Sequence, residues 1–229
     1  MSISHSKSYF QPLKVSIIKF LVYGSMIYLT AEILKWSATE HPLGSKFSEQ
    51  SLVEYLQSVL LLLSSAIYLW ISFRYKSVFP LAFGLFAFHF ASLIREQDAY
   101  LDEYIYDGAW QTFAFGILFL AIFLIYSKWR LFLTNIAGFV QSFSFGILLS
   151  GIMTTYIFAR LYGRKVFWMA VMESQYTRDV KNVSEESLEL YGYVLLVISG
   201  VEFFLLAKGS AKTLALKTPL DRPHLNASA

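Results

Sequence analysis

Six apolar blocks constrain this chain more than any other feature of its sequence. They cover residues 15–36, 51–72, 78–94, 109–126, 131–158 and 188–207. An α-helix needs roughly 20 apolar residues to cross the hydrocarbon core of a bilayer. The third and fourth blocks are short, so their charged flanks should lie near the interface. We therefore predict an all-α, polytopic membrane protein, a six-helix transmembrane bundle whose first partner is the lipid bilayer.

The composition agrees with this class. Only 15% of the residues are charged, whereas a soluble domain usually carries about 25%. Aromatic side chains stand at block ends, among them Trp36, Trp70, Trp110 and Trp129, as expected of rings that face both lipid and water. The absence of cysteine excludes disulfides, thiolate metal sites and a cysteine nucleophile. The net charge of +3 comes from membrane flanks, so it does not indicate nucleic-acid binding.

The loop charges predict an orientation. Basic residues hold short loops in the cytoplasm, and the N-terminal segment, the second and fourth loops and the C-terminal tail together carry eleven Lys and Arg with one acid, Asp221. The other three loops and their helix ends carry eight basic residues and fourteen acids. We expect both termini in the cytoplasm and the acids on the outer side of a plasma membrane, in a bacterium the inner membrane.

The domain organisation is simple. We expect one transmembrane domain over residues 1–208, with an uncleaved first helix, and a flexible cytoplasmic tail over 209–229. The tail contains Pro219 and Pro223 and has little periodicity.

Small residues recur in the fifth block at a spacing of four. They are Gly138, Ser142, Gly146 and Ser150. On one helix they would form a ridge that lets another helix approach closely, or line a pore. We expect Gly84 and Gly116, in the third and fourth blocks, to serve close contacts as well.

The longest outer loop contains the segment 164–172, "RKVFWMAVM", which is charged at its start and apolar after it. Such a segment can lie flat in the outer interface as a short helix. The alternative is a re-entrant lid over the acidic face.

Two pairs of helix-start signals involve acids. Ser51 and Glu54 match a capping box at the start of the second block, although Glu54 is also a candidate site residue. Ser184 before Glu185 and Glu186 suggests a second helix start, where acids are favourable.

Two glutamates enter the sixth block. Glu189 lies just inside the apolar run, where a carboxylate normally needs a partner or water, and Tyr193 at i+4 could donate to it. Glu202 lies nearer the cytoplasmic end, and the sequence does not identify its partner.

The stretch 93–110, "LIREQDAYLDEYIYDGAW", holds the densest group of charges. If the third helix continues past Ile94, Arg95, Asp98 and Asp102 share one face. Glu96 lies on another face, with His89 two turns deeper. An interhelical ion pair for Arg95 with Glu96 and a hydrogen-bonded structural His89 are the simpler interpretations.

The known motif templates fail. There is no His-Glu-x-x-His helix, no phosphate-cradling Gly-Lys-Ser/Thr loop and no Gly-x-Ser-x-Gly elbow. The four histidines are scattered, and the predicted orientation separates them into two pairs.

The leading hypothesis is an outward-facing acidic vestibule that binds or transports a cation or cationic ligand. Its candidate ligand-binding residues are Glu54, His89, Arg95, Glu96, Asp98, Asp102, Glu185 and Glu189. Glu96, Asp102 and Glu189 are the candidate metal ligands, and their carboxylates suit Ca, Mg or Mn.

Two other classes stay open. One is an accessory subunit whose charges pair with a membrane-protein partner or a second copy. The other is an enzyme at the outer interface, in which Glu96 and Glu189 act as base and metal anchor on a lipid-linked substrate.

Overall fold

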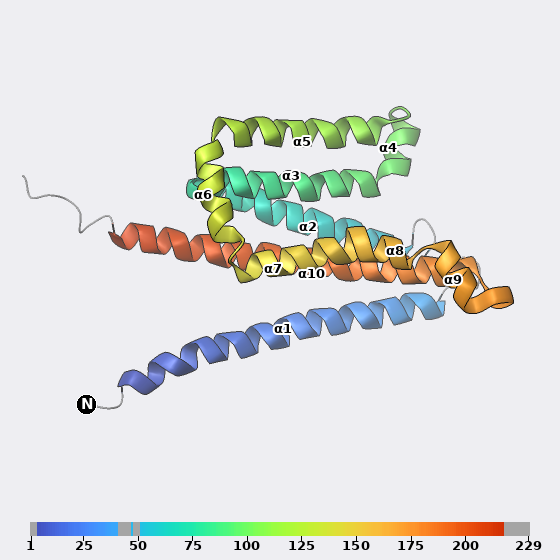
Figure 1. Cartoon of the computed structure of the whole chain (residues 1–229), viewed down its shortest axis with the longest axis horizontal. Helices are drawn as coiled ribbons and strands as arrows, with labels where there is room; N and C mark the ends of the chain where they lie inside the picture. The colour runs from blue at the N-terminus through green and yellow to red at the C-terminus, as the bar shows by residue number, and fades with distance from the viewer. Residues whose placement is uncertain (1–3, 41–46, 48–50, 218–229) are drawn as a thin grey trace, which may run out of the picture. The chain divides into compact units, whose positions relative to one another are not determined.

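The computed structural model of the chain describes residues 4–40, 47 and 51–217, with side chains over 10–40, 47 and 51–211. Every regular element in these ranges is helical (Figure 1). The elements are α1 (Ser4–Glu40), α2 (Leu52–Arg74), η1 (Lys76–Val78), α3 (Phe79–Glu96), α4 (Asp98–Tyr104), α5 (Ala109–Ser127), α6 (Trp129–Phe139), α7 (Phe143–Ile152), the π-helix η2 (Met153–Ala159), α8 (Arg160–Tyr162), α9 (Lys165–Met172), η3 (Glu173–Gln175) and α10 (Arg178–Lys217).

Six helical stretches are long and apolar enough to cross a membrane. They are Phe10–Glu40, Leu52–Arg74, Lys76–Glu96, Ala109–Ser127, Phe143–Tyr162 and Arg178–Ala211. The prediction of six apolar spans in an all-helical chain is therefore confirmed. The apolar window of the first span is only 6% buried, which is the state expected of a helix whose surroundings are lipid.

The fifth block is not one helix. The chain turns at residues 140–142, so α6 and α7 are separate elements and only α7 continues into a span. The predicted ridge is therefore wrong, because Gly138 lies in α6 while Gly146 and Ser150 lie in α7. Apart from chain neighbours and the backbone of its own helix, no described atom lies within 4 Å of a Cβ built on Gly138, Gly146 or Gly116. The expected close contact at Gly116 is therefore absent too.

Two helix boundaries also differ from the prediction. The third helix ends at Glu96, and Gln97 separates it from α4, so Arg95 does not continue onto the same helix as Asp98 and Asp102. α10 begins at Arg178 rather than at Ser184, whose hydroxyl donates to the Val180 carbonyl inside the helix at 2.6 Å. Ser51 does cap α2, because its Oγ accepts from the Glu54 N–H at 3.4 Å.

The chain divides into two compact units, one of Met1–Gln57 with Gly151–Leu195 and the other of Ser58–Ser150 with Leu196–Ala229. The prediction of a single domain over 1–208 stays a prediction. The first part of the expected tail continues α10 as far as Lys217, and residues 218–229 lie outside the described residues.

In the second unit, α3 and α5 lie side by side as a hairpin that α4 closes (Figure 1). Ile125 Cδ1 lies 3.0 Å from the place of a Cβ on Gly84, which confirms the close contact predicted there. α6 folds across the other end, where the Asn135 side chain donates to the Ser77 carbonyl at 2.9 Å. The hairpin thus has a polar loop at one end and a short helix at the other.

In the first unit, the π-helix η2 and α8 pack along the first half of α10 (Figure 1). Two glycines allow this approach. A Cβ on Gly163 would lie 2.8 Å from the Glu185 Cβ, and a Cβ on Gly192 would overlap the Thr155 hydroxyl. The seam between these helices therefore has no room for larger side chains at its two ends, and charged side chains lie between them.

Candidate functional site

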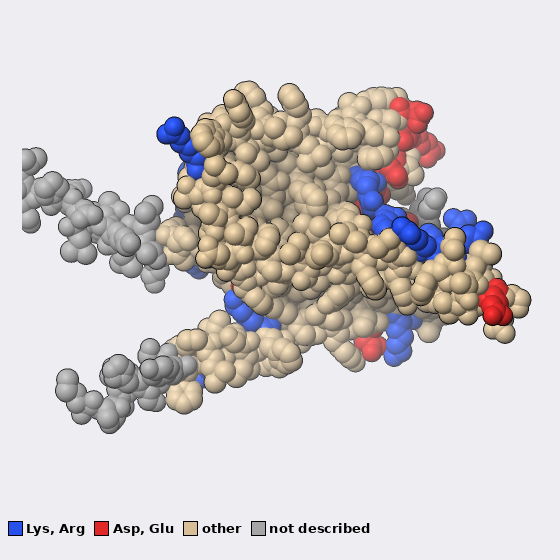
Figure 2. All heavy atoms as spheres, viewed as in Figure 1, with Lys and Arg blue, Asp and Glu red and all other residues tan. Residues whose placement is uncertain are grey.

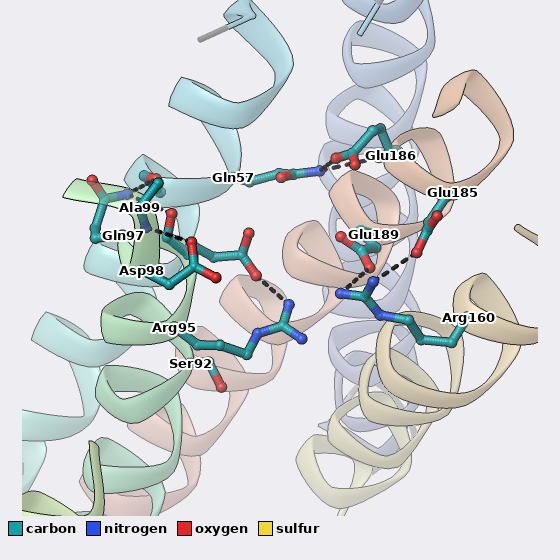
Figure 3. Close-up of polar contacts among 12 residues, drawn as sticks. Gln57, Ser92, Arg95, Gln97, Asp98, Ala99, Arg160, Glu185, Glu186 and Glu189 are labelled. Atoms are coloured by element: carbon teal, nitrogen blue, oxygen red, sulfur yellow. Dashed lines mark hydrogen bonds and ion pairs between the residues drawn. The ribbon is translucent and has the colours of Figure 1, made fainter. Parts of the chain in front are cut away.

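The strongest polar cluster of the first unit is built around Arg160 (Figure 3). Its Nη1 donates to Glu185 Oε1 at 2.6 Å, and its Nη2 lies 3.0 Å from Glu189 Oε1 as an ion pair. Lys181 Nζ lies 2.5 Å from the second oxygen of Glu185. We call Arg160, Lys181, Glu185 and Glu189 the Arg160 cluster.

The helices explain why these side chains meet. Glu185 and Glu189 are four residues apart on α10, and residues four apart share one face of a helix. Lys181 lies one turn earlier on the same face and reaches Glu185. Arg160 is the first residue after the π-helix, and π-turns are rare elements that occur frequently at functional sites.

The burial of the cluster is asymmetric. The carboxyl side chains of Glu185 and Glu189 are 8% and 3% exposed, whereas the Arg160 side chain is 45% exposed. Buried carboxylates lose their hydration and need a cation nearby. The anions are thus held inside the helix packing, and the guanidinium that neutralises them reaches them from an accessible position.

A second contact extends the cluster along α10. The Gln57 Nε2 donates to the carbonyl of Glu186 at 3.2 Å and to its carboxylate at 2.9 Å (Figure 3). The Gln57 Oε1 is buried and has no hydrogen-bond partner within the part of the chain that the structure describes. With Glu186 included, three carboxylates stand against two cations, so this end of α10 carries one net negative charge when all five are ionised.

The charged stretch at the end of α3 and in α4 makes local contacts instead of a cluster like that of Arg160. Arg95 Nη2 lies 2.5 Å from Glu96 Oε1, so this ion pair joins neighbouring residues of α3, and the interhelical pair stays a prediction. Asp98 Oδ1 accepts from the Ala99 N–H at 2.6 Å, and Asp102 Oδ1 accepts from the Gly108 N–H at 3.1 Å. Gly108 has φ +88° and forms the turn that leads into α5. The hydrogen bond from its N–H to the Asp102 carboxylate stabilises this turn. These contacts support a loop structure, and Figure 2 shows acidic side chains at the surface over α4.

His89 lies in a neutral, fully buried network of the second unit. Its Nδ1 is 2.7 Å from the Leu85 carbonyl, and its ring stacks on Tyr68 with 4.8 Å between centroids. The Tyr68 hydroxyl is 3.0 Å from Ser199 Oγ, and Ser144 and Ser199 each donate to the other's carbonyl at 2.9 Å. Because a carbonyl oxygen only accepts, Nδ1 carries a proton, and Nε2 has no hydrogen-bond partner among the described residues. We call Tyr68, His89, Ser144 and Ser199 the Tyr68 network.

The structure brings together only part of the predicted site. Glu185 and Glu189 converge on one cation. Glu54 marks the start of α2. Glu189 belongs to one unit and Glu96 and Asp102 to the other, so their joint metal site stays a prediction. Within the described residues, no group of three or more His, Asp or Glu side chains could hold a metal ion.

Sequence reasoning missed Arg160, Lys181 and Gln57. Arg160 could have been found, because it directly follows an apolar run and a charge there needs a partner. Gln57 carries no comparable signal, since a lone glutamine in an apolar helix is compatible with many contacts. No known protein family matches the chain, and neither does any curated protein or solved structure.

Proposed function

We propose that this multi-pass membrane protein binds a cationic ligand at Glu185 and Glu189, in exchange with the guanidinium of Arg160. One observation carries the proposal: two buried carboxylates on adjacent turns of α10 hold a cation whose own side chain is 45% exposed. A ligand that displaces Arg160 would therefore find both anions already in place. Preorganised charges of this kind reduce the ordering that binding requires.

The contacts favour a guanidinium or ammonium group over a metal ion. The two carboxylates already accommodate the guanidinium of Arg160, which contacts one oxygen of each. The described residues hold no group of three acids or histidines placed for a metal. Calcium and magnesium usually take six or more oxygen ligands, which makes them the poorer candidates.

We further propose that the Arg160 cluster faces away from the cytoplasm. The support is the charge pattern of the loops, which favours cytoplasmic termini, in a bacterium at the inner membrane. Because the chain has no cysteine, a single Asp102→Cys variant tests this orientation. An impermeant thiol reagent should label it in intact cells, and labelling only after lysis would reverse the orientation.

The other two functions predicted from the sequence receive no specific support. The proposed acid pair of an enzyme, Glu96 and Glu189, comes from two different units. An accessory subunit would use surface charges, but the charges of the Arg160 cluster are largely satisfied within the chain. Cation binding at this cluster is thus the better-supported class.

Two variants with opposite expected effects on ligand stabilisation test whether a cation exchanges with Arg160. The purified protein is titrated with methylguanidinium, tetramethylammonium, Mg²⁺ and Ca²⁺, and thermal stability is followed in detergent, since a ligand that binds only the folded state stabilises it. Glu189→Gln should abolish the stabilisation by the organic cations. Arg160→Gln should increase it, because the guanidinium that competes for both carboxylates is gone while the carboxylates remain, and Lys181 contacts only Glu185.

Glu103→Gln provides the matched control, because Glu103 is an exposed acid on α4. It should respond to each cation as the unmodified protein does. An equal response in Arg160→Gln and the unmodified chain would contradict the exchange. Stabilisation by Mg²⁺ or Ca²⁺ alone, lost in Glu189→Gln, would replace the organic cation with a metal.

A further inference from the structure

The segment between the fifth and sixth spans contains α9, a helix with an unusually apolar exposed surface. Val166, Phe167, Met169 and Val171 are all exposed, with 77% of Val166 and 59% of Val171 accessible. Trp168 and Met172, one turn apart, are the less exposed positions. Neither the Arg160 cluster nor the proposed cation binding uses this helix.

The chain fixes the depth of α9 relative to the membrane. The fifth candidate span ends at Tyr162, so the start of the connecting segment lies near the bilayer boundary. α9 starts three residues after Tyr162, and three residues reach at most about 10 Å. Its apolar side chains are therefore held close to the level where the span leaves the hydrocarbon.

Aromatic contacts fold α9 back onto the end of the span. The Trp168 Nε1 donates to the Tyr162 carbonyl at 2.9 Å. The Tyr162 ring contacts Trp168 and Phe167, with centroids 5.2 and 5.4 Å apart, and stacks on Phe158. These contacts prevent α9 from extending into water. Tryptophan and tyrosine are also the residues that favour the membrane–water boundary.

Basic side chains occur at the same level. Arg164 and Lys165, at the start of α9, are both exposed, and Figure 2 shows blue side chains over α8 and the beginning of α9. The segment 160–181 contains five basic residues and only two acids, Glu173 and Asp179, although the outer loops as a whole are acidic. Lys and Arg beside an apolar helix surface are complementary to anionic lipid headgroups.

We propose that α9 is a lipid-binding helix that lies in the membrane–water interface, with its apolar side chains among the upper acyl carbons and Arg164 and Lys165 on the phosphates of anionic phospholipids. The contacts with Tyr162 set its depth, and the basic start of the helix selects the headgroup. This site is independent of the proposed exchange at Glu185 and Glu189.

Because the chain has no cysteine, the depth of α9 can be measured with labels on single introduced cysteines. Nitroxide labels are attached at Val166→Cys and, separately, at Val171→Cys, in nanodiscs, and their accessibility to oxygen and to a water-soluble nickel chelate is compared. Glu103→Cys on α4 calibrates water, and Val201→Cys, exposed on the sixth span, calibrates the hydrocarbon. We expect oxygen-to-nickel ratios between those of the two calibration sites at both positions.

The headgroup is tested in nanodiscs of phosphatidylcholine alone and with added phosphatidylglycerol. The anionic lipid should shift the ratios toward the hydrocarbon value, and Arg164→Gln with Lys165→Gln should remove this shift. Ratios equal to the Glu103→Cys value would place α9 in water and overturn the proposal. Exclusion of both reagents would mean that protein covers α9, as a lid or a second copy would, and a lack of lipid dependence would overturn the headgroup contact.

Discussion

The Arg160 cluster and the Tyr68 network both bury polar groups in helices apolar enough to cross a membrane, yet their chemistry differs. The Arg160 cluster is ionic, and its cation is accessible. The Tyr68 network has hydroxyls and one imidazole, and Tyr68, His89 and Ser199 are fully buried. On α10, Glu189 directly precedes a run of twelve residues without charge, and Ser199 lies inside that run.

The contrast follows from the cost of removing charge from water. An ion deep in a low-dielectric interior loses several kcal/mol of hydration, and pairing recovers it only with excellent geometry. Hydroxyl groups lose much less and can join helices by modest hydrogen bonds. The end of the span can therefore hold exchangeable charge, whereas its interior holds neutral groups that fix helix packing.

The largest effect is expected from removing the guanidinium of Arg160. Arg160→Gln should lower the free energy of unfolding by about 3 kcal/mol, the lower end for broken buried pairs, because Arg160 itself is partly exposed. Denaturant titration in detergent micelles measures this loss. Arg160→Gln with Glu189→Gln should lose less than the sum of the two single variants, and additive losses would show that the two residues are not coupled.

The glycine contact beside the cluster should give the next effect. A Cβ on Gly192 would overlap the Thr155 hydroxyl and lie 3.1 Å from the Gly151 carbonyl, so Gly192→Ala should destabilise by about 2 kcal/mol, as overpacking does. Adding Thr155→Ala should recover part of the loss, which the same titration measures. If Gly192→Ala leaves stability unchanged, the helices of the first unit are not packed as closely as described.

A smaller effect is expected in the Tyr68 network. Tyr68→Phe removes the hydroxyl that meets Ser199 and keeps the ring against His89 and Phe203. The loss should be about 1 kcal/mol, the usual net value of a neutral hydrogen bond. A loss as large as that of Arg160→Gln would remove the distinction between the ionic and neutral regions.

His89→Leu should have the smallest effect, below about 1 kcal/mol, because a substitution of similar volume is well tolerated in a core. It also removes the buried Nε2, which has no hydrogen-bond partner. Micelle denaturation again provides the measurement, with His89→Gln as a polar comparison. Strong destabilisation by leucine alone would show that Nε2 has a partner in the folded protein.

The lengths of the apolar blocks predicted the spans well, because whether a segment can span depends on its local composition. It failed in the fifth block, where α6 is apolar enough to join a span but turns away at residues 140–142. The capping signal at Ser184 also placed the start of α10 six residues too late, since residues 178–183 are already helical. Glu189 was found as a costly charge and Glu185 as an acid at a helix start. Their partner Arg160 was not found, because Arg160 and Glu189 are 29 residues apart and meet only through tertiary packing.

The π-helix η2 has a consequence for how the chain length around it can vary. A π-turn holds about one residue more than an α-turn. Deleting one residue from Met153–Ala159 would turn this segment into ordinary helix and keep Gly151 and Arg160 in nearly the same rotational relation, because the π segment winds about one residue less than an α-helix of the same length. A one-residue deletion in the α-helical part of the span would instead rotate the residues before it by about 100° relative to Arg160. The π-helix can therefore absorb a change of one residue that the rest of the span cannot.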